Sequence, residues 1–213
     1  MIIVGAKGFA KELLQIVSVD MEMPDDAIVF FDNMSTDLPD KIFNRFKLLK
    51  SLEAVKDFMV SSGDASFVLG LGNPRLREKL HDEFILLGAV PKTVISKNAE
   101  IGSFDVKLGE GTSVMTGARI SNAVTIGKGC LIYYNAIITH DCQMGNFVEM
   151  SPGATILGRC TIGNYTMVGA GAIILPDVTI GNNVTIGAGA VILNDVPDNY
   201  TVVGVPGRII SKQ

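Results

Sequence analysis

The chain has 213 residues, 47% of them hydrophobic in type, which is enough for one large core or for two modest domains. Its 18 basic residues stand against 22 acidic ones and form no cluster that could neutralise several phosphates, so we expect no nucleic-acid partner. The opening apolar run, Met1 to Val4, is too short for a signal peptide, and no other run approaches the roughly 20 apolar residues of a membrane-spanning helix. We therefore expect a cytoplasmic protein with no membrane partner.

Short apolar strands alternate with helical patterns in the first ninety residues. The expected strands span 1–4, 28–31 and 67–71. The expected helices follow a tight turn at 5–8, begin at Ser51, and begin after Asn73, whose side chain can cap a helix that has Pro74 in its first turn; Gly88 ends this last helix. Strands that alternate with helices predict a parallel sheet, so residues 1–90 are expected to form a Rossmann-like α/β domain.

A period of six residues replaces the helical pattern from about residue 95. Long or branched aliphatic residues recur at every sixth position, and a smaller residue stands four places after each one. The aliphatic positions are Leu108, Val114, Ile120, Ile126, Ile132, Ile138, Met144, Met150, Ile156, Ile162, Val168, Ile174, Ile180, Ile186 and Ile192. The smaller residues run in the same steps from Thr112 to Val196. We expect both sets to face the core.

Corners between the repeats are expected where Gly follows the aliphatic residue, as in Ile126-Gly127 and Met144-Gly145, because Gly tolerates a positive φ. Three corners close a coil of eighteen residues, and stacked coils form a parallel β-helix. Residues 108–197 supply five coils, and the seven-residue step from Ile101 to Leu108 predicts a further coil with a one-residue bulge. Residues 91–213 are therefore expected to form an all-β domain, a parallel β-helix with a C-terminal tail.

The three cysteines, Cys130, Cys142 and Cys160, all fall on the smaller inward positions. Cys142 and Cys160 are eighteen residues apart and so stack in neighbouring coils, where a disulfide is geometrically conceivable. In a cytoplasmic protein we expect buried free thiols instead. No cysteine has CxxC or paired metal spacing, and we expect no metal cofactor.

Three segments give the chain a resemblance to a known family. They are Ile2-Ile3-Val4-Gly5-Ala6-Lys7-Gly8-Phe9-Ala10, Asn135-Ala136-Ile137-Ile138-Thr139-His140-Asp141-Cys142, and Val203-Gly204-Val205-Pro206-Gly207-Arg208. With the repeats, they resemble the hexapeptide-repeat sugar acyltransferases, a family that includes sialic acid O-acetyltransferases and bacillosamine and perosamine N-acetyltransferases.

This resemblance implies a left-handed β-helix and a homotrimer that binds acetyl-CoA, the co-substrate, in the groove between adjacent β-helices. It implies that the N-terminal domain holds the sugar or nucleotide-sugar substrate. It also implies a CoA contact nine residues beyond the catalytic base, at Glu149, together with main-chain contacts near Ala170 and Ala188. An alternative is that Ala170 and Ala188 are only the small corners that a β-helix needs. Arg208 could meet a phosphate of CoA or could be solvated.

His140 is the candidate general base, because it follows the inward Ile138 by two residues and should leave the coil. Acetyl transfer needs a proton removed from the attacking amine or hydroxyl, and imidazole suits this task. Asp141 could hold the other ring nitrogen. Gly158, eighteen residues on, is the candidate donor to the oxyanion of the tetrahedral intermediate. The alternatives are an ordinary corner His with a capping Asp, and a Gly needed only for packing.

The other histidine, His81, is expected on the solvated face of its helix. The buried stripe expected for this helix consists of Leu76, Leu80, Phe84 and Leu87.

Substrate contacts in the N-terminal domain are expected at Gly8, Phe9, Asp32 and Asn33. The loop at 5–8 follows a strand and opens a helix, where backbone N–H groups can meet an anion, and Asp32 ends the second strand. The family commonly has His and Gly where this chain has Phe9 and Ala10. An alternative for Asp32 and Asn33 is a plain turn, and the loop at 70–73 is a further place for a nucleotide.

We expect direct transfer of an acetyl group from acetyl-CoA to the amine of a nucleotide-linked amino sugar, as in surface-glycan synthesis. One alternative is O-acetylation of a sialic acid or related sugar, and another is a non-catalytic β-helix scaffold, against which His140 and Asp141 argue. A β-helical zinc carbonic anhydrase needs three histidine ligands, and the repeats hold only His140. A nucleotidyltransferase usually needs a much larger N-terminal domain.

Overall fold

The computed structural model describes residues 1–212. Contacts divide the chain into two compact units, Met1–Val94 and Ile95–Gln213, slightly later than the expected boundary at residue 90. No helix within residues 1–212 has both the length and the apolar character needed to cross a membrane.

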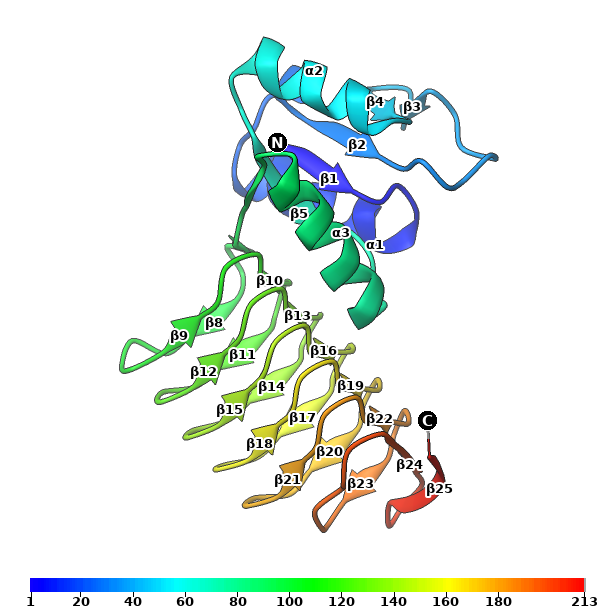
Figure 1. Cartoon of the computed structure of the whole chain (residues 1–213). Helices are drawn as coiled ribbons and strands as arrows, with labels where there is room; N and C mark the ends of the chain where they lie inside the picture. Colours follow the sequence, from blue (N-terminus) through cyan, green and yellow to red (C-terminus); the bar gives the residue numbers. More distant parts are fainter. Residues whose placement is uncertain (213) are drawn as a thin grey trace. The chain divides into compact units, whose positions relative to one another are not determined.

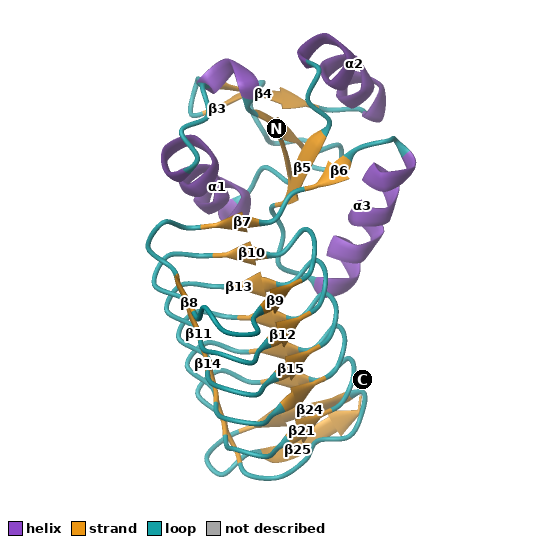
Figure 2. Ribbon diagram, turned by 90° about the vertical axis from the view of Figure 1, so that its left-hand side faces the viewer, coloured by secondary structure: helices purple, strands orange, loops and turns teal. Residues whose placement is uncertain are grey.

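The first unit is an α/β fold around one sheet with the strand order β3-β4-β2-β1-β5-β6. All neighbouring strands are parallel except β3 and β4. The strands are β1 (Ile2–Val4), β2 (Val29–Phe31), β3 (Lys41–Ile42), β4 (Phe46–Leu49), β5 (Ser66–Leu69) and β6 (Val90–Pro91). The helices are α1 (Gly8–Leu14), which continues as a π-helix over Gln15–Asp20, a 3-10 turn at Asp25–Ala27, α2 (Leu52–Ser62) and α3 (Pro74–Leu86). Helix α1 covers one face of the sheet, and α2 and α3 cover the other (Figure 2).

The helix ends follow from local side-chain chemistry. Ser51 accepts a hydrogen bond from the N–H of Ala54 at 3.2 Å, and Asn73 accepts one from the N–H of Leu76 at 3.0 Å. Pro74 occupies the first turn of α3, and Gly88 follows its end with a φ of +86°.

The hairpin of β3 and β4 was not predicted. Its turn residues, Phe43 and Asn44, both have positive φ, at 52° and 55°. A turn with positive φ at two successive residues normally uses Asn-Gly or Gly-Gly there, so the sequence lacks the usual signal.

The second unit is a β-helix whose short strands repeat every eighteen residues and form three parallel sheets. Within each sheet the strands follow one another in chain order (Figure 1). The first sheet contains β7 (Val94–Ile95), β10 (Ser113–Val114), β13 (Leu131–Ile132), β16 (Glu149–Met150), β19 (Met167–Val168) and β22 (Thr185–Ile186), followed by β24 (Tyr200–Val203) and the antiparallel β25 (Arg208–Lys212). The second contains β8 (Glu100–Ile101), β11 (Arg119–Ile120), β14 (Ile137–Ile138), β17 (Thr155–Ile156), β20 (Ile173–Ile174) and β23 (Val191–Ile192). The third contains β9 (Lys107–Leu108), β12 (Thr125–Ile126), β15 (Gln143–Met144), β18 (Thr161–Ile162) and β21 (Thr179–Ile180).

The register places residues eighteen apart directly beside one another, as in Ile120, Ile138 and Ile156. All the expected smaller positions are buried, and so are all the aliphatic positions except Leu108, which is partly buried. The extra residue between Ile101 and Leu108 lies in a corner, where Phe104 is 73% exposed.

The expected role of the repeat glycines was wrong. In a typical corner the residue with positive φ comes three places after the aliphatic residue, and it need not be Gly: Phe147 has a φ of 54° and Arg159 one of 63°. Gly145, which directly follows Met144, has no positive φ. A Cβ atom there would be 2.7 Å from Oδ1 of Asn164 in the next coil, so Gly145 is needed for close approach between coils.

Candidate active site

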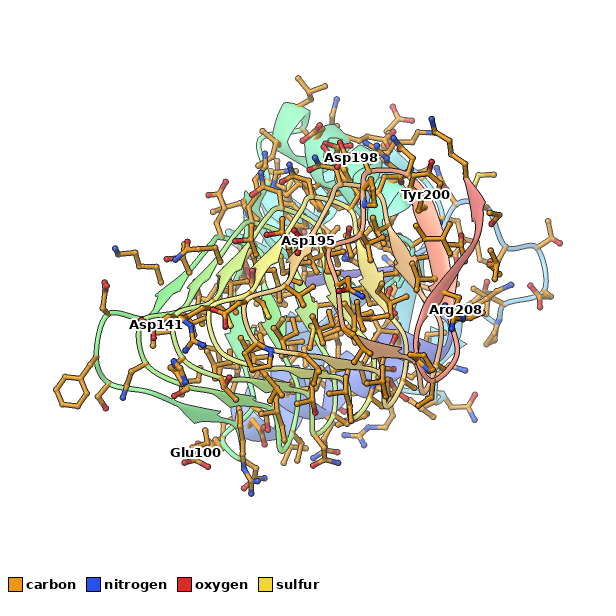
Figure 3. The ribbon with its side chains drawn as sticks, turned by 90° about the horizontal axis from the view of Figure 1, so that it is seen from below. Glu100, Asp141, Asp195, Asp198, Tyr200 and Arg208 are labelled. Atoms are coloured by element: carbon orange, nitrogen blue, oxygen red, sulfur yellow. The ribbon has the colours of Figure 1, made fainter. Side chains whose placement is uncertain are left out.

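His140 and Asp141 form the corner between β14 and β15, and their side chains are 54% and 57% exposed. Asp141 has a φ of 60°, which Asp tolerates better than most residues, and its N–H donates to the carbonyl of Asn122 at 3.3 Å. The β-helix core therefore fixes the backbone at this corner, while both functional side chains reach solvent. In Figure 3, Asp141 marks this corner, and Arg208 lies on a different side of the coil.

The His140 ring is oriented by its neighbour. Nδ1 lies 2.7 Å from Oδ2 of Asp141. A carboxylate can only accept a hydrogen bond, so this contact places a proton on Nδ1 and leaves the lone pair of a neutral imidazole on Nε2. Within residues 1–212, Nε2 makes no hydrogen bond. This arrangement has the base and its orienting carboxylate that proton abstraction requires.

Gly158 lies against the His140 ring. A Cβ atom on residue 158 would be 2.5 Å from Cε1 of the ring and 2.8 Å from Nε2, so no larger residue fits without moving the imidazole. The next residue, Arg159, donates its N–H to the carbonyl of His140 at 3.1 Å. The N–H of Gly158 has no acceptor among the described residues. One free backbone donor thus lies beside the base.

Ala170 and Ala188 lie at a different corner, before β20 and β23, and both are exposed. The structure does not bring them together with His140 within one chain: strands of the second sheet separate the two corners. The equivalent residue two coils before Ala170 is Tyr134, so this corner does not require small residues. The N–H groups of both alanines are free of hydrogen bonds within the described part of the chain.

Glu149 and Arg208 differ in accessibility. Glu149 is only 9% exposed, and its Oε1 accepts a hydrogen bond from the Ser151 hydroxyl at 3.3 Å. Arg208 is exposed on β25 and pairs with Val203, whose side chain lies against Gly187, the residue before Ala188. The backbone of Arg208 is therefore at the end of the β-helix, close to the coil that contains Ala188.

The N-terminal unit contains a cavity of about 410 Å³ at the carboxyl ends of β1, β2 and β5. This is where the chain order in the sheet reverses, the usual ligand position in such folds. Its lining includes the loop at 5–7, Asp32, Asn33, the loop at 70–71 and one face of α3. Two expected contact residues, Gly8 and Phe9, do not line it and instead begin α1.

The Asp32 carboxylate is engaged within its own loop. Oδ1 accepts hydrogen bonds from the N–H groups of Met34 and Ser35 at 3.0 and 2.9 Å, and Oδ2 accepts one from the Ser35 hydroxyl at 3.0 Å. The direct effect of Asp32 is therefore to shape residues 32–35 at the edge of the cavity. Asn33 lies within this loop and Lys7 lies in the loop after β1.

Of the stripe expected to be buried on α3, only Phe84 is buried; Leu76, Leu80 and Leu87 are not, and His81, expected in solvent, is. The buried residues of this helix are Pro74, Arg77, His81 and Phe84. His81 is 3% exposed and packs edge-on against Phe67, and Arg77 donates a hydrogen bond to the carbonyl of Gly72. Leu76 and Leu80 instead line the cavity together with Glu83, a position that their sequence pattern did not predict. Their spacing of four residues fits either role.

All three cysteines are free and buried, as expected. No three His, Cys, Asp or Glu side chains gather as a possible metal site within residues 1–212.

The repeat region of the chain matches one protein-family model. Residues 159–194 match the family model described as bacterial transferase hexapeptide (six repeats). A search of curated proteins finds no match.

Solved structures give longer matches. The acetyltransferase domain of PglB from Neisseria gonorrhoeae FA1090, in complex with acetyl coenzyme A, is 28% identical; 98% of each chain is covered, with a TM-score of 0.87. PerB from Caulobacter crescentus, in complex with CoA and GDP-perosamine, is 28% identical over 99% of this chain and 96% of that one, with a TM-score of 0.85. WeeI from Acinetobacter baumannii AYE is 29% identical over 98% of each chain, with a TM-score of 0.88.

These likenesses confirm the predicted fold class, an α/β domain followed by a left-handed parallel β-helix. The repeat match and the full-length structural likeness show that the chain is an acyltransferase whose structure is similar to those of the hexapeptide-repeat sugar acyltransferases.

Proposed function

We propose that the protein transfers the acetyl group of acetyl-CoA to the amine of a nucleotide-linked amino sugar, with His140 as the general base. The observation that carries this proposal is the arrangement of three groups: Nε2 of His140 is unbonded, Nδ1 is held by Asp141, and the free N–H of Gly158 lies beside the ring. The likeness to PerB, which was solved with CoA and GDP-perosamine, supports the class of acceptor.

The reaction is a direct transfer. The amine nitrogen attacks the thioester carbonyl carbon of acetyl-CoA, and Nε2 of His140 takes the proton that the amine loses. The carbonyl oxygen becomes an oxyanion, to which Gly158 donates its N–H. The tetrahedral intermediate then collapses, the C–S bond breaks, and CoA leaves as a thiolate that takes the proton from the imidazolium. Asp141 stabilises the imidazolium between these steps.

Acetyl-CoA is proposed to lie along the corner formed by Ala170 and Ala188, where free main-chain N–H groups can bind the amide oxygens of pantetheine. Because Tyr134 occupies the equivalent corner position in an earlier coil, the two small residues are better explained by a ligand than by the fold. Arg208 is a partner for a CoA phosphate. Glu149, at 9% exposure, offers only one edge of its carboxylate.

Within one chain the Ala170 and His140 corners lie apart, so a site that includes both needs two chains. A homotrimer would bring the Ala170 corner of one chain to the His140 corner of its neighbour. Ile173, 37% exposed on the face between them, provides apolar surface for such an interface. The proposed location is the cytoplasm, which suits three free thiols.

The cavity of the N-terminal unit is proposed to bind the nucleotide. Lys7 supplies a cation for the diphosphate, Asn33 supplies an amide for the base or ribose, and Leu76 and Leu80 supply an apolar wall. Asp32 acts by holding the loop that presents Asn33. Gly8 and Phe9, at the start of α1, are proposed to contact the sugar beyond the cavity.

The test is thiol release from acetyl-CoA by the purified protein with UDP-, GDP- and CMP-linked amino sugars, and separately with free sialic acids. We expect turnover with a nucleotide-linked amine and a product heavier by one acetyl group. Turnover only with hydroxyl acceptors would replace N-acetylation by O-acetylation. Absence of both turnover and acetyl-CoA binding would leave a scaffold.

A further inference from the structure

The β-helix uses its buried thiols and hydroxyls in one consistent way. Every smaller inward position that holds Cys or Thr donates a hydrogen bond to the carbonyl oxygen fifteen residues later, in the next coil. The pairs are Thr112 to Gly127 at 3.1 Å, Cys130 to Gly145 at 3.1 Å, Cys142 to Leu157 at 3.3 Å, Cys160 to Leu175 at 3.0 Å, and Thr166 to Gly181 at 2.8 Å. Each of these donors gives a corner carbonyl a hydrogen-bond partner from the interior of the β-helix.

One of these carbonyls belongs to the proposed active site. The Leu157 oxygen that accepts from Cys142 is on the Leu157–Gly158 peptide group, whose N–H is the proposed oxyanion donor. The same sulfur lies 3.5 Å from the carbonyl oxygen of His140. A single buried side chain, 1% exposed, thus contacts the backbone of both the base and the donor.

A peptide group is planar and conjugated, so a hydrogen bond at its oxygen affects its N–H. Fixing the Leu157 oxygen fixes the direction of the Gly158 N–H. A hydrogen bond accepted at the oxygen also polarises the group and strengthens its N–H as a donor. Both effects act before the reaction, when an oxyanion donor must already be in place.

The other two cysteines make the same contact without this consequence. Cys160 donates to Leu175, whose peptide group continues into Pro176 and has no N–H. Cys130 donates to Gly145, and the N–H of the following Asn146 is already bonded to Oδ1 of Asn164 at 2.7 Å. Only the Cys142 contact holds a peptide group that has a free N–H beside the base.

We infer that Cys142 is a positioning residue for acetyl transfer, which orients the Gly158 N–H through the Leu157 carbonyl. This inference rests on the proposed function of the His140 corner. It goes beyond packing because it predicts a loss in kcat that the equivalent cysteines do not share.

The protonation state of Cys142 sets the conditions of the test. The neighbouring Cys160 side chain lowers the pKa of Cys142 to about 7, although burial acts in the opposite direction. The other titratable group that acts on it is the His140 imidazole. Only the protonated thiol can donate to Leu157, so the comparison is made at a pH of about 6, below this pKa.

The test compares Cys142→Ala, Cys142→Ser and the matched control Cys130→Ala, assayed by acetyl transfer. We expect kcat to fall about tenfold in Cys142→Ala, a fraction of the roughly hundredfold loss for an absent oxyanion donor, with KM for acetyl-CoA unchanged. Cys142→Ser keeps a donor and should recover most of kcat, and Cys130→Ala should keep the wild-type kcat. Equal kcat in all four proteins, or equal losses in both alanine variants, would overturn the inference while leaving the proposed function intact.

A second readout does not depend on turnover. In protein labelled with ¹⁵N-glycine, the amide signal of Gly158 should shift in Cys142→Ala, return toward its original position in Cys142→Ser, and stay in place in Cys130→Ala. An unchanged Gly158 signal in Cys142→Ala would reject the positioning role even if no acceptor sugar were turned over. If the Gly158 signal shifts in Cys142→Ala but the wild-type protein shows no acetyl transfer, the result would instead count against the proposed function.

Discussion

The imidazole of His140 covers Gly158 so closely that a Cβ atom on residue 158 would lie 2.8 Å from Nε2. Real Cβ atoms do not approach a ring nitrogen this closely, so Gly158→Ala must displace the imidazole. We expect kcat to fall at least about a hundredfold, because the displaced imidazole can no longer take the proton from the acceptor amine. Acetyl transfer measured at saturating acetyl-CoA gives this value.

The control is the same substitution in a His140→Asn background. If the damage arises from the displaced base, Gly158→Ala should cost much less there, and the two effects should not add. Full additivity would mean that Gly158→Ala does not act through the His140 side chain.

The contact between Asp141 and Nδ1 of His140 can be tested without disturbing the corner. Asp141 has a φ of 60°, and Asn tolerates this left-handed conformation as well as Asp does. Asp141→Asn therefore keeps the turn but removes the charge that stabilises the imidazolium. We expect kcat to fall about tenfold, since both side chains are more than half exposed and water screens the pair. An unchanged kcat would mean that Asp141 forms the corner but does not assist catalysis.

The sequence predicted the β-helix well because stacking leaves the chain little freedom. A residue eighteen places from another must lie beside it, so the neighbourhood of His140 and Gly158 followed from counting alone. Counting could not show why residue 158 is Gly. The reason is the His140 imidazole, which lies against residue 158 and is oriented by its contact with Asp141.

The α/β unit was harder to predict, because its helix faces are set by packing. On α3, Leu76 and Leu80 fit an inward stripe by spacing, yet the helix is turned so that Arg77 and His81 are buried. Arg77 can be buried because the carbonyl of Gly72 accepts its hydrogen bond. No local pattern announces such a partner, and none announced that both oxygens of Asp32 would be used within its own loop.

Arg77 offers a stability test of this reorientation. The side chain is 1% exposed, and its truncation would leave the space around it empty and remove the hydrogen bond to Gly72. We expect Arg77→Ala to lower the free energy of unfolding by about 3 kcal/mol. Arg75→Ala is the matched control, because Arg75 is 57% exposed and should change stability by no more than about 0.5 kcal/mol. Denaturant unfolding with similar losses in both variants would contradict the buried face described here.

A substitution at the Ala170 corner tests acetyl-CoA binding separately from catalysis. Tyr134 shows that the fold accepts a bulky residue at this corner, so Ala170→Tyr should fold normally. If acetyl-CoA lies along the corner, the new ring should raise KM for acetyl-CoA at least about tenfold and leave kcat at saturation nearly unchanged. Gly158→Ala should show the reverse pattern. A normal KM in Ala170→Tyr would remove this corner from the CoA site.

The pH dependence of the Cys142 variants follows from the direction of its pKa. The pKa of Cys142 is lowered to about 7, so the thiol loses its proton as the pH rises through this value and can no longer donate to the Leu157 carbonyl. A serine hydroxyl keeps its proton throughout this range. The quantity to compare is the ratio of kcat for Cys142→Ser to kcat for the wild type. We expect this ratio to rise severalfold between a pH of about 6 and a pH of about 8. A ratio that stays flat, in steady-state assays at both pH values, would mean that the thiol keeps its proton in the folded protein or that its hydrogen bond to Leu157 does not affect the reaction; the kcat of Cys142→Ala at the lower pH distinguishes these two explanations.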